Sequence, residues 1–223
     1  MLISHKHKFI IIEIPKTGTT SLRKALRTLG VVDVFGKPTV GKLRRERLAF
    51  YQHGSIMDAN EALKHRGRDL DEYFKFSAVR NPWNRYFSFL TYYKTKLKYY
   101  QETKEPLEEN QQRQKKYILN LFGGKTDRQI LIAIIEKFSH QKKYLINING
   151  DVVMDKIGQL ENISNDFNVF CESAGIIPTP KLLHENKSDS QFLIKEELYT
   201  QELIDMVAKK EKWVIERFNY KYT

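Results

Sequence analysis

The segment Ile14–Leu22 (IPKTGTTSL) gathers residue types that bind a phosphate group. The apolar run before it predicts a buried strand, and Pro15 with Gly18 predicts a sharp turn that opens a helix. Backbone N–H groups at a helix N-terminus, together with the helix dipole, attract anions. Lys16 adds a positive charge, and a run of hydroxyl residues adds donors: Thr19, Thr20 and Ser21. The segment therefore predicts an anion-binding turn.

The order of these residues differs from that of the usual P-loop, G-x-x-x-x-G-K-[ST]. Here Lys16 precedes Gly18, the upstream glycine is absent, and no acidic partner for magnesium is evident. The structural alternative is a plain strand-to-helix turn with capping hydroxyls. We favour phosphate binding, because a lysine, a glycine and a run of hydroxyl residues rarely coincide at one turn.

A second strand-to-helix segment, Phe76–Ser88, carries Arg80 where the predicted strand ends. Ligands bind at the carboxyl edge of open α/β sheets, and a guanidinium can hold a phosphate through two hydrogen bonds. Ser88 lies about two helical turns further on, in a helix that begins near Pro82. The alternative role for Arg80 is a structural ion pair.

Strands alternate with helices along the chain, which predicts an α/β fold with a central, mainly parallel sheet flanked by helices. The best-defined strands are Lys8–Ile14 and Tyr73–Val79, and Val31–Phe35 is a short candidate. Asn149-Gly150 predicts a hairpin turn between Tyr144–Ile148 and Val152–Ile157. The pattern of residues 101–116 fits a surface helix, a lid or a disordered segment. Helices are predicted at 20–29, Ser55–Lys64, Pro82–Tyr100, Thr126–Phe138, Ile163–Ala174 and Thr200–Phe218.

Length and composition suit one soluble globular domain spanning residues 1–223. No apolar run reaches the roughly 18 residues that a membrane-spanning helix needs, so we expect no transmembrane segment. Peripheral membrane contact stays open, because the net charge of +11 favours anionic partners. The single cysteine, Cys171, predicts a core role in a reducing, cytoplasmic setting.

The two segments IPKTGTTSL and FSAVRNPWNRYFSF together resemble the binding motifs of sulfotransferases for 3′-phosphoadenosine 5′-phosphosulfate (PAPS). The likeness is greatest to the carbohydrate sulfotransferases, such as the heparan sulfate 2-O and chondroitin enzymes, and to small bacterial members. Three further segments are similar to parts of that family: YQHGSIMDANEAL, KYLINING-DVVMDKIGQLENI and LLHENKSDS. The resemblance implies a P-loop-like three-layer fold.

The same resemblance implies roles for individual residues. Arg80 and Ser88 would bind the 3′-phosphate of PAPS, and Lys187 with Ser188 would close over the nucleotide. The 5′-phosphosulfate would be held by the first turn, through Lys16, Thr17, Gly18, Thr19, Thr20 and Ser21.

A sugar hydroxyl needs a general base, and His53 is the strongest candidate, because histidine titrates near neutral pH and the family context supports it. Asp58, Glu61 and His184 compete for this role. The resemblance implies in-line transfer of the sulfuryl group from PAPS to a hydroxyl, with adenosine 3′,5′-bisphosphate as product. Lys16 would stabilise charge on the leaving oxygen, and no metal is expected.

The acceptor is expected to be a glycan or glycoconjugate rather than nucleic acid. A tyrosine cluster either faces the sugar or packs between helices: Tyr92, Tyr93, Tyr99 and Tyr100. Two other functions compete. A magnesium-dependent nucleotide kinase or NTPase would use the first turn as a phosphate loop, and a non-catalytic polyanion-binding protein would rely on charge alone.

Overall fold

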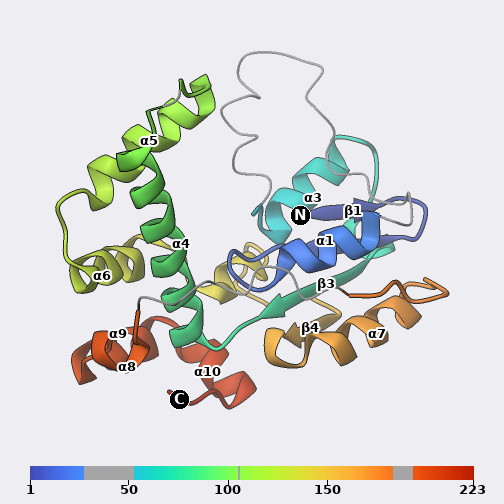
Figure 1. Ribbon diagram of the computed structural model, residues 1–223. Helices are drawn as coiled ribbons and strands as arrows, with labels where there is room; N and C mark the ends of the chain where they lie inside the picture. The colour runs from blue at the N-terminus through green and yellow to red at the C-terminus, as the bar shows by residue number, and fades with distance from the viewer. Residues whose placement is uncertain (28–52, 105, 183–192) are drawn as a thin grey trace. The chain divides into compact units, whose positions relative to one another are not determined.

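The computed structural model describes residues 1–27, 53–104, 106–182 and 193–223 (Figure 1). The predicted strand Val31–Phe35 lies outside these residues. The chain divides into two compact units. The first contains Met1–Asn81 and His140–Asn186, and the second contains Pro82–Ser139 and Lys187–Thr223. That residues 1–223 act as one domain stays a prediction.

A four-stranded sheet of order β1-β2-β3-β4 organises the first unit (Figure 1). Strand β2 runs parallel to β3, and β3 runs parallel to β4, while β1 pairs antiparallel with β2 at the edge. This arrangement confirms the predicted α/β fold with a mainly parallel sheet flanked by helices. The short edge strand β1 was not predicted. The strand bounds are Leu2–Ser4 for β1, Phe9–Ile12 for β2, Phe74–Val79 for β3 and Lys156–Gln159 for β4.

Helices α1 (Thr19–Arg27) and α7 (Ile163–Ser173) share one hydrophobic core with β2 and β3. Phe170 of α7 is central to this core, because its ring centroid lies 4.8 Å from that of Phe76 and 5.2 Å from that of Phe9. Cys171 is buried in the same core, as predicted, and burial raises the pKa of its thiol to about 12. The strands that deliver the two predicted ligand-binding segments are therefore anchored by apolar packing.

Helix α3 (Ile56–Lys64) begins where the sequence predicted, at an N-cap formed by Ser55. The Ser55 hydroxyl accepts a hydrogen bond from the Asp58 amide at 3.3 Å, and the Asp58 carboxylate accepts one from the Ser55 amide at 2.7 Å. This capping box satisfies two N–H groups that a helix end leaves without partners. A 3₁₀ turn, Leu70–Glu72, follows before β3.

The segment between His140 and β4 forms a shorter hairpin than predicted. Ile146 and Val152 form an antiparallel bridge, the Asn147 amide donates to the Asp151 carbonyl at 2.9 Å, and the Val153 amide donates to the Leu145 carbonyl at 3.2 Å. At the turn, the Asn147 side chain accepts the amides of Asn149 and Asp151, both at 2.9 Å. The end of the second arm pairs with β3 as β4 instead. Parallel pairing inside the sheet satisfies more backbone groups than an isolated two-stranded hairpin. Two 3₁₀ turns flank this region, Gln141–Tyr144 and Leu160–Asn162.

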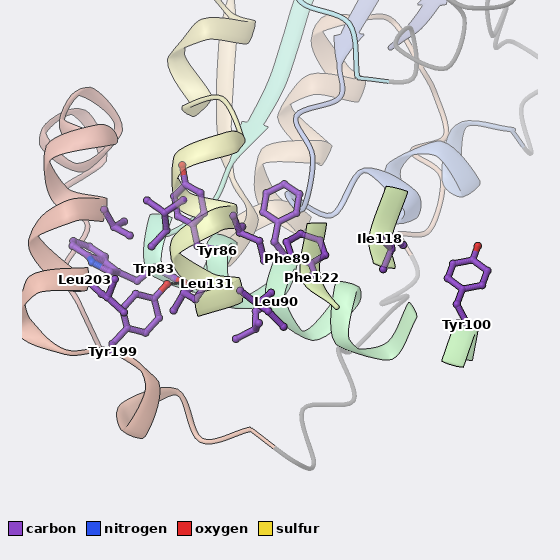
Figure 2. Close-up of a cluster of buried hydrophobic side chains, with 14 residues drawn as sticks. Trp83, Tyr86, Phe89, Leu90, Tyr100, Ile118, Phe122, Leu131, Tyr199 and Leu203 are labelled. Atoms are coloured by element: carbon purple, nitrogen blue, oxygen red, sulfur yellow. Dashed lines mark hydrogen bonds between the residues drawn. The ribbon is translucent and has the colours of Figure 1, made fainter. Parts of the chain in front are cut away.

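The second unit is helical. Its core is built from aromatic and aliphatic side chains that include Trp83, Tyr86 and Phe122 (Figure 2). No helix among the described residues is long and apolar enough to cross a membrane. The helices are α4 (Pro82–Glu102), α5 (Glu109–Phe122), α6 (Asp127–Lys137), α8 (Lys195–Leu198), α9 (Gln201–Lys210) and α10 (Lys212–Phe218).

Two features of this unit refine the sequence analysis. Helix α5 covers the second half of the polar segment 101–116, whose state was left open, and its buried residues Ile118 and Phe122 follow that segment. The helix predicted over Thr200–Phe218 is divided at Glu211, whose φ of −106° and ψ of 19° are not helical. The buried Glu211 carboxylate instead pairs with Arg85 at 2.9 Å and accepts a hydrogen bond from the Tyr86 hydroxyl at 3.2 Å.

Candidate anion-binding site and catalytic base

The turn between β2 and α1 has the tight geometry that its sequence predicts. Lys16 and Gly18 both have positive φ angles, 68° and 76°, and the amide of Ser21 donates to the Gly18 carbonyl at 3.1 Å. The positive φ of Gly18 favours glycine, and a Cβ atom there would lie 2.4 Å from Cδ1 of Leu160, so that side chain would also have to move. The buried Thr17 hydroxyl donates to the Ile14 carbonyl at 2.9 Å. The turn is thus held rigidly at the N-terminus of α1.

Lys16 and Arg80 lie together although 64 residues separate them in the sequence. A guanidinium N–H of Arg80 donates to the Lys16 carbonyl at 3.3 Å. Burial, with a further contribution from the positive charge of Arg80, lowers the pKa of Lys16 to about 8. At neutral pH two like charges therefore sit at the turn, and an anion bound there would relieve their repulsion. Lys16 of the first motif and Arg80 of the second therefore lie at one place.

The backbone of Arg80 is held by a residue that the sequence analysis did not identify. Gln141 is completely buried, and its side-chain amide bonds both main-chain groups of Arg80 at 2.9 Å: Oε1 accepts from the N–H, and Nε2 donates to the carbonyl. The next amide, of Asn81, donates to the Glu161 carboxylate at 2.8 Å. These contacts fix the point where the chain leaves β3, and a signal for Gln141 is not visible in the sequence.

His53 lies against the residue that follows β2. Its Nδ1 is 2.8 Å from the main-chain carbonyl of Glu13. Because a carbonyl only accepts hydrogen bonds, Nδ1 carries the hydrogen, and Nε2 of the neutral ring keeps its lone pair. Burial lowers the pKa of His53, while the hydrogen bond and charge of Glu13 act in the opposite direction. The ring is therefore neutral at pH 7 and able to accept a proton at Nε2.

The competing bases are placed less suitably. Asp58 is engaged by both the amide and the hydroxyl of Ser55 in the capping box, each at 2.7 Å. Glu61 is exposed on α3 and lies 3.8 Å from His65. His184 lies outside the described residues. Among the described candidates, His53 alone touches the strand that leads into the turn.

The remaining residues predicted to bind PAPS differ in burial and in the unit to which they belong. Thr19 is nearly buried, Thr20 is exposed and Ser21 is half-buried in the first turn of α1. Ser88 is buried on α4 in the second unit, so its pairing with Arg80 of the first unit stays a prediction. Lys187 and Ser188 lie outside the described residues.

The aromatic residues near the second motif are mainly structural. Trp83 is buried in the core of the second unit and donates through Nε1 to the Ile204 carbonyl at 3.1 Å. In the tyrosine cluster, Tyr93 packs against Phe122 and Tyr100 is buried. The remaining two members, Tyr92 and Tyr99, are exposed on α4.

A comparison with known proteins agrees with this geometry. The profile of the sulfotransferase family matches residues 1–221, nearly the whole chain, and therefore includes both motifs. No curated protein and no solved structure matches the chain significantly. A match of this extent, over an α/β fold whose two motifs meet at a basic turn, shows that the chain belongs to the sulfotransferase family.

Proposed function

We propose that this sulfotransferase moves the sulfuryl group of PAPS to the hydroxyl of a carbohydrate acceptor. The observation that carries the proposal is the convergence of Lys16 and Arg80 at the N-terminus of α1. PAPS carries a 5′-phosphosulfate and a 3′-phosphate, so it offers anionic groups to both cations. The helix amides and the Lys16 ammonium suit the phosphosulfate, and the planar guanidinium of Arg80 suits the 3′-phosphate.

The chemical step is a displacement at sulfur. The acceptor oxygen forms a bond to sulfur as the bond from sulfur to the bridging phosphate oxygen breaks, and that oxygen leaves with the electron pair. His53 takes the acceptor's proton on Nε2, which the hydrogen bond at Nδ1 leaves available. Lys16 and the turn amides stabilise the negative charge that develops on the leaving oxygen. Adenosine 3′,5′-bisphosphate is the product.

A carbohydrate acceptor is supported by the chemistry of the chain rather than by a visible subsite. The net charge of +11 attracts anionic glycans and steers them towards the protein. Tyr92 and Tyr99 add exposed aromatic faces on α4, the helix that begins within the second motif. Glycans that carry carboxylate or sulfate groups are therefore the first acceptors to screen.

Calorimetric titration with adenosine 3′,5′-bisphosphate in the absence of magnesium tests the nucleotide site. We expect micromolar binding by the wild type, and loss of binding in Lys16→Ala and in Arg80→Ala. Lys24→Ala is the matched control, because it removes an exposed positive charge from the same helix without changing the turn. No binding by the folded wild type, or equal losses in all three variants, would contradict the proposal.

The second test measures transfer of the sulfuryl group from PAPS to candidate glycans. We expect turnover by the wild type, and a loss of about 100- to 10,000-fold in His53→Ala, the range typical of a general base. Nucleotide binding should be retained in this variant. Turnover that depends on magnesium and ATP instead of PAPS would favour a kinase.

A further inference from the structure

Glu13 is a buried charged residue beside the proposed site, and the mechanism above does not use its carboxylate. It directly follows β2 and is inaccessible to solvent. Its carboxylate pairs with Arg23 of α1, with Nε of Arg23 at 3.1 Å from Oε1 and a second, shorter contact to Oε2. The amino group of Met1 lies 2.8 Å from Oε2. A buried carboxylate persists in a protein when such partners compensate for its lost hydration.

The same residue also holds His53. The main-chain carbonyl of Glu13 accepts the hydrogen of Nδ1 at 2.8 Å. Among the described residues, three charged groups act on the ring: the Glu13 carboxylate favours its protonated form, while the Met1 amino group and Arg23 disfavour it. Glu13 therefore supplies the hydrogen bond that orients the imidazole. Among the described residues, its carboxylate is also the negative charge that favours the protonated ring.

We propose that Glu13 is a positioning residue for His53, which orients the ring through its main-chain carbonyl and stabilises the protonated ring through its carboxylate. The inference rests on the proposed function, in which His53 accepts the proton of the acceptor hydroxyl. When Nε2 takes this proton, the ring becomes a cation and Nδ1–H stays on the Glu13 carbonyl. The opposite charge on the Glu13 side chain then lowers the energy of the ion pair formed during transfer.

This arrangement differs from the carboxylate of a Ser-His-Asp triad, which bonds the histidine directly. Here the Glu13 carboxylate acts on His53 electrostatically without a hydrogen bond, and the Glu13 main-chain carbonyl accepts the hydrogen bond from Nδ1. Arg23 joins Glu13 to α1, the helix whose N-terminus forms the anion-binding turn. The parts that would activate the acceptor and hold the leaving group are thus connected by one buried ion pair.

The experiment compares Glu13→Gln and Arg23→Gln, which remove opposite charges and keep the main chain. The His53 ring is titrated by NMR without nucleotide, and its signals are assigned with His53→Ala. We expect the pKa of His53 to fall in Glu13→Gln and to rise in Arg23→Gln. General loosening of the structure would expose the ring and raise the pKa in both variants. An unchanged or raised pKa in folded Glu13→Gln would therefore overturn the proposal.

Activity gives a second readout. In Glu13→Gln we expect turnover to fall about 10-fold, at the low end of the effect of a general base, and the acid limb of the pH–rate profile to move to lower pH. The Kd for adenosine 3′,5′-bisphosphate should stay within about twofold of the wild-type value. Glu72→Gln is the control, since it removes a carboxylate that pairs with Lys8 at the surface. Its profile should match the wild type.

The outcomes separate this inference from the proposed function. If His53→Ala keeps wild-type turnover, the assignment of the base is wrong. If His53→Ala is inactive while Glu13→Gln keeps the wild-type pH–rate profile, the proposed function stands and the role of Glu13 is wrong. If Glu13→Gln does not fold, an unchanged or lowered pKa of His53 in Arg23→Gln contradicts the proposal. A raised pKa supports it only if the chemical shifts of neighbouring amides show that the packing around the ring is unchanged.

Discussion

Arg80 and Arg85 lie five residues apart in the sequence but meet opposite electrostatic environments in the two units. Arg85 is fully buried, and its charge is matched by Glu211 at 2.9 Å and by the Ser139 carbonyl at 3.2 Å. Arg80 is half-buried and lies close enough to Lys16 to help lower the pKa of that lysine. Removing one partner of a buried ion pair such as Arg85–Glu211 destabilises a fold. Two neighbouring positive charges such as Lys16 and Arg80 repel each other and favour the binding of an anionic ligand. The role of an arginine therefore follows from the groups that face it.

The largest expected effect is on the matched arginine. Arg85→Met leaves the buried carboxylate of Glu211 without its cation, so we expect the free energy of unfolding to fall by about 3–5 kcal/mol. Arg80→Met should change it by less, about 1 kcal/mol, because Arg80 is only half-buried and its removal also ends the repulsion between its charge and that of Lys16. Urea denaturation of both variants measures the difference. Equal losses of stability in the two variants would contradict the proposed difference between Arg85 and Arg80.

Lys16→Met should separate activity from stability. We expect turnover to fall about 100- to 1,000-fold, as when one donor to a developing oxyanion is removed. Without nucleotide the variant should be at least as stable as the wild type, because Lys16 has a lowered folded-state pKa and so destabilises the fold while it is charged. As pH rises from about 8 towards the usual lysine value, this penalty disappears, and the two stabilities should converge. Thermal unfolding of both proteins at pH 7 and pH 10 measures whether this stability difference has the expected sign and shrinks as pH rises.

Two glycines with similar backbone conformations sharpen the contrast between the units. Gly18 has a φ of 76°, and a Cβ atom there would displace the side chain of Leu160, whereas Gly124, at 72°, has no atom within 4 Å of that position. Gly124→Ala should cost only the conformational strain, about 1 kcal/mol. Gly18→Ala should cost more, about 2–3 kcal/mol, and should also weaken nucleotide binding. Denaturation and calorimetry on the two variants test this, and equal costs would contradict the packing argument.

The smallest expected effect is a proton linked to nucleotide binding. Lys16 loses its proton around pH 8 in the free protein, and a bound bisphosphate should raise this pKa because it adds negative charge. Binding of adenosine 3′,5′-bisphosphate near pH 8 should therefore take up a fraction of a proton and weaken at higher pH. Calorimetry in buffers of different ionisation enthalpy measures the uptake. In Lys16→Arg, whose side chain does not titrate in this range, it should be absent.

Much of the local structure could be predicted from the sequence. The capping boxes at Ser55 and Thr126 marked the starts of α3 and α6, and Pro82 marked the start of α4. These signals depend on hydrogen bonds and backbone preferences within about four residues, so they are readable without knowledge of the fold. The tight turn before α1, with positive φ angles at Lys16 and Gly18, belongs to the same class.

Predictions that depended on partners far away in the chain were less successful. Asn149-Gly150 forms a turn and the start of the second arm pairs with the first, yet the end of that arm, from Lys156, joins β3 in the sheet. Glu211 interrupts the predicted last helix where its carboxylate meets Arg85. In both cases the free energy of a long-range contact outweighs the local conformational preference. The local sequence pattern carries no information about that contact.

The sequence by itself determined which residues we propose for the chemistry, because Lys16, Arg80 and His53 each lie in a segment whose pattern is local. Only the tertiary structure decided which groups surround them. Parallel pairing of β2 with β3 brings Arg80 to the Lys16 carbonyl, buried Gln141 clamps Arg80 from 61 residues away, and Glu13 orients His53 across 40 residues. The physical reason is that a pKa and a tautomer depend on the charges and hydrogen-bond partners around a group, and folding assembles these from distant parts of the chain.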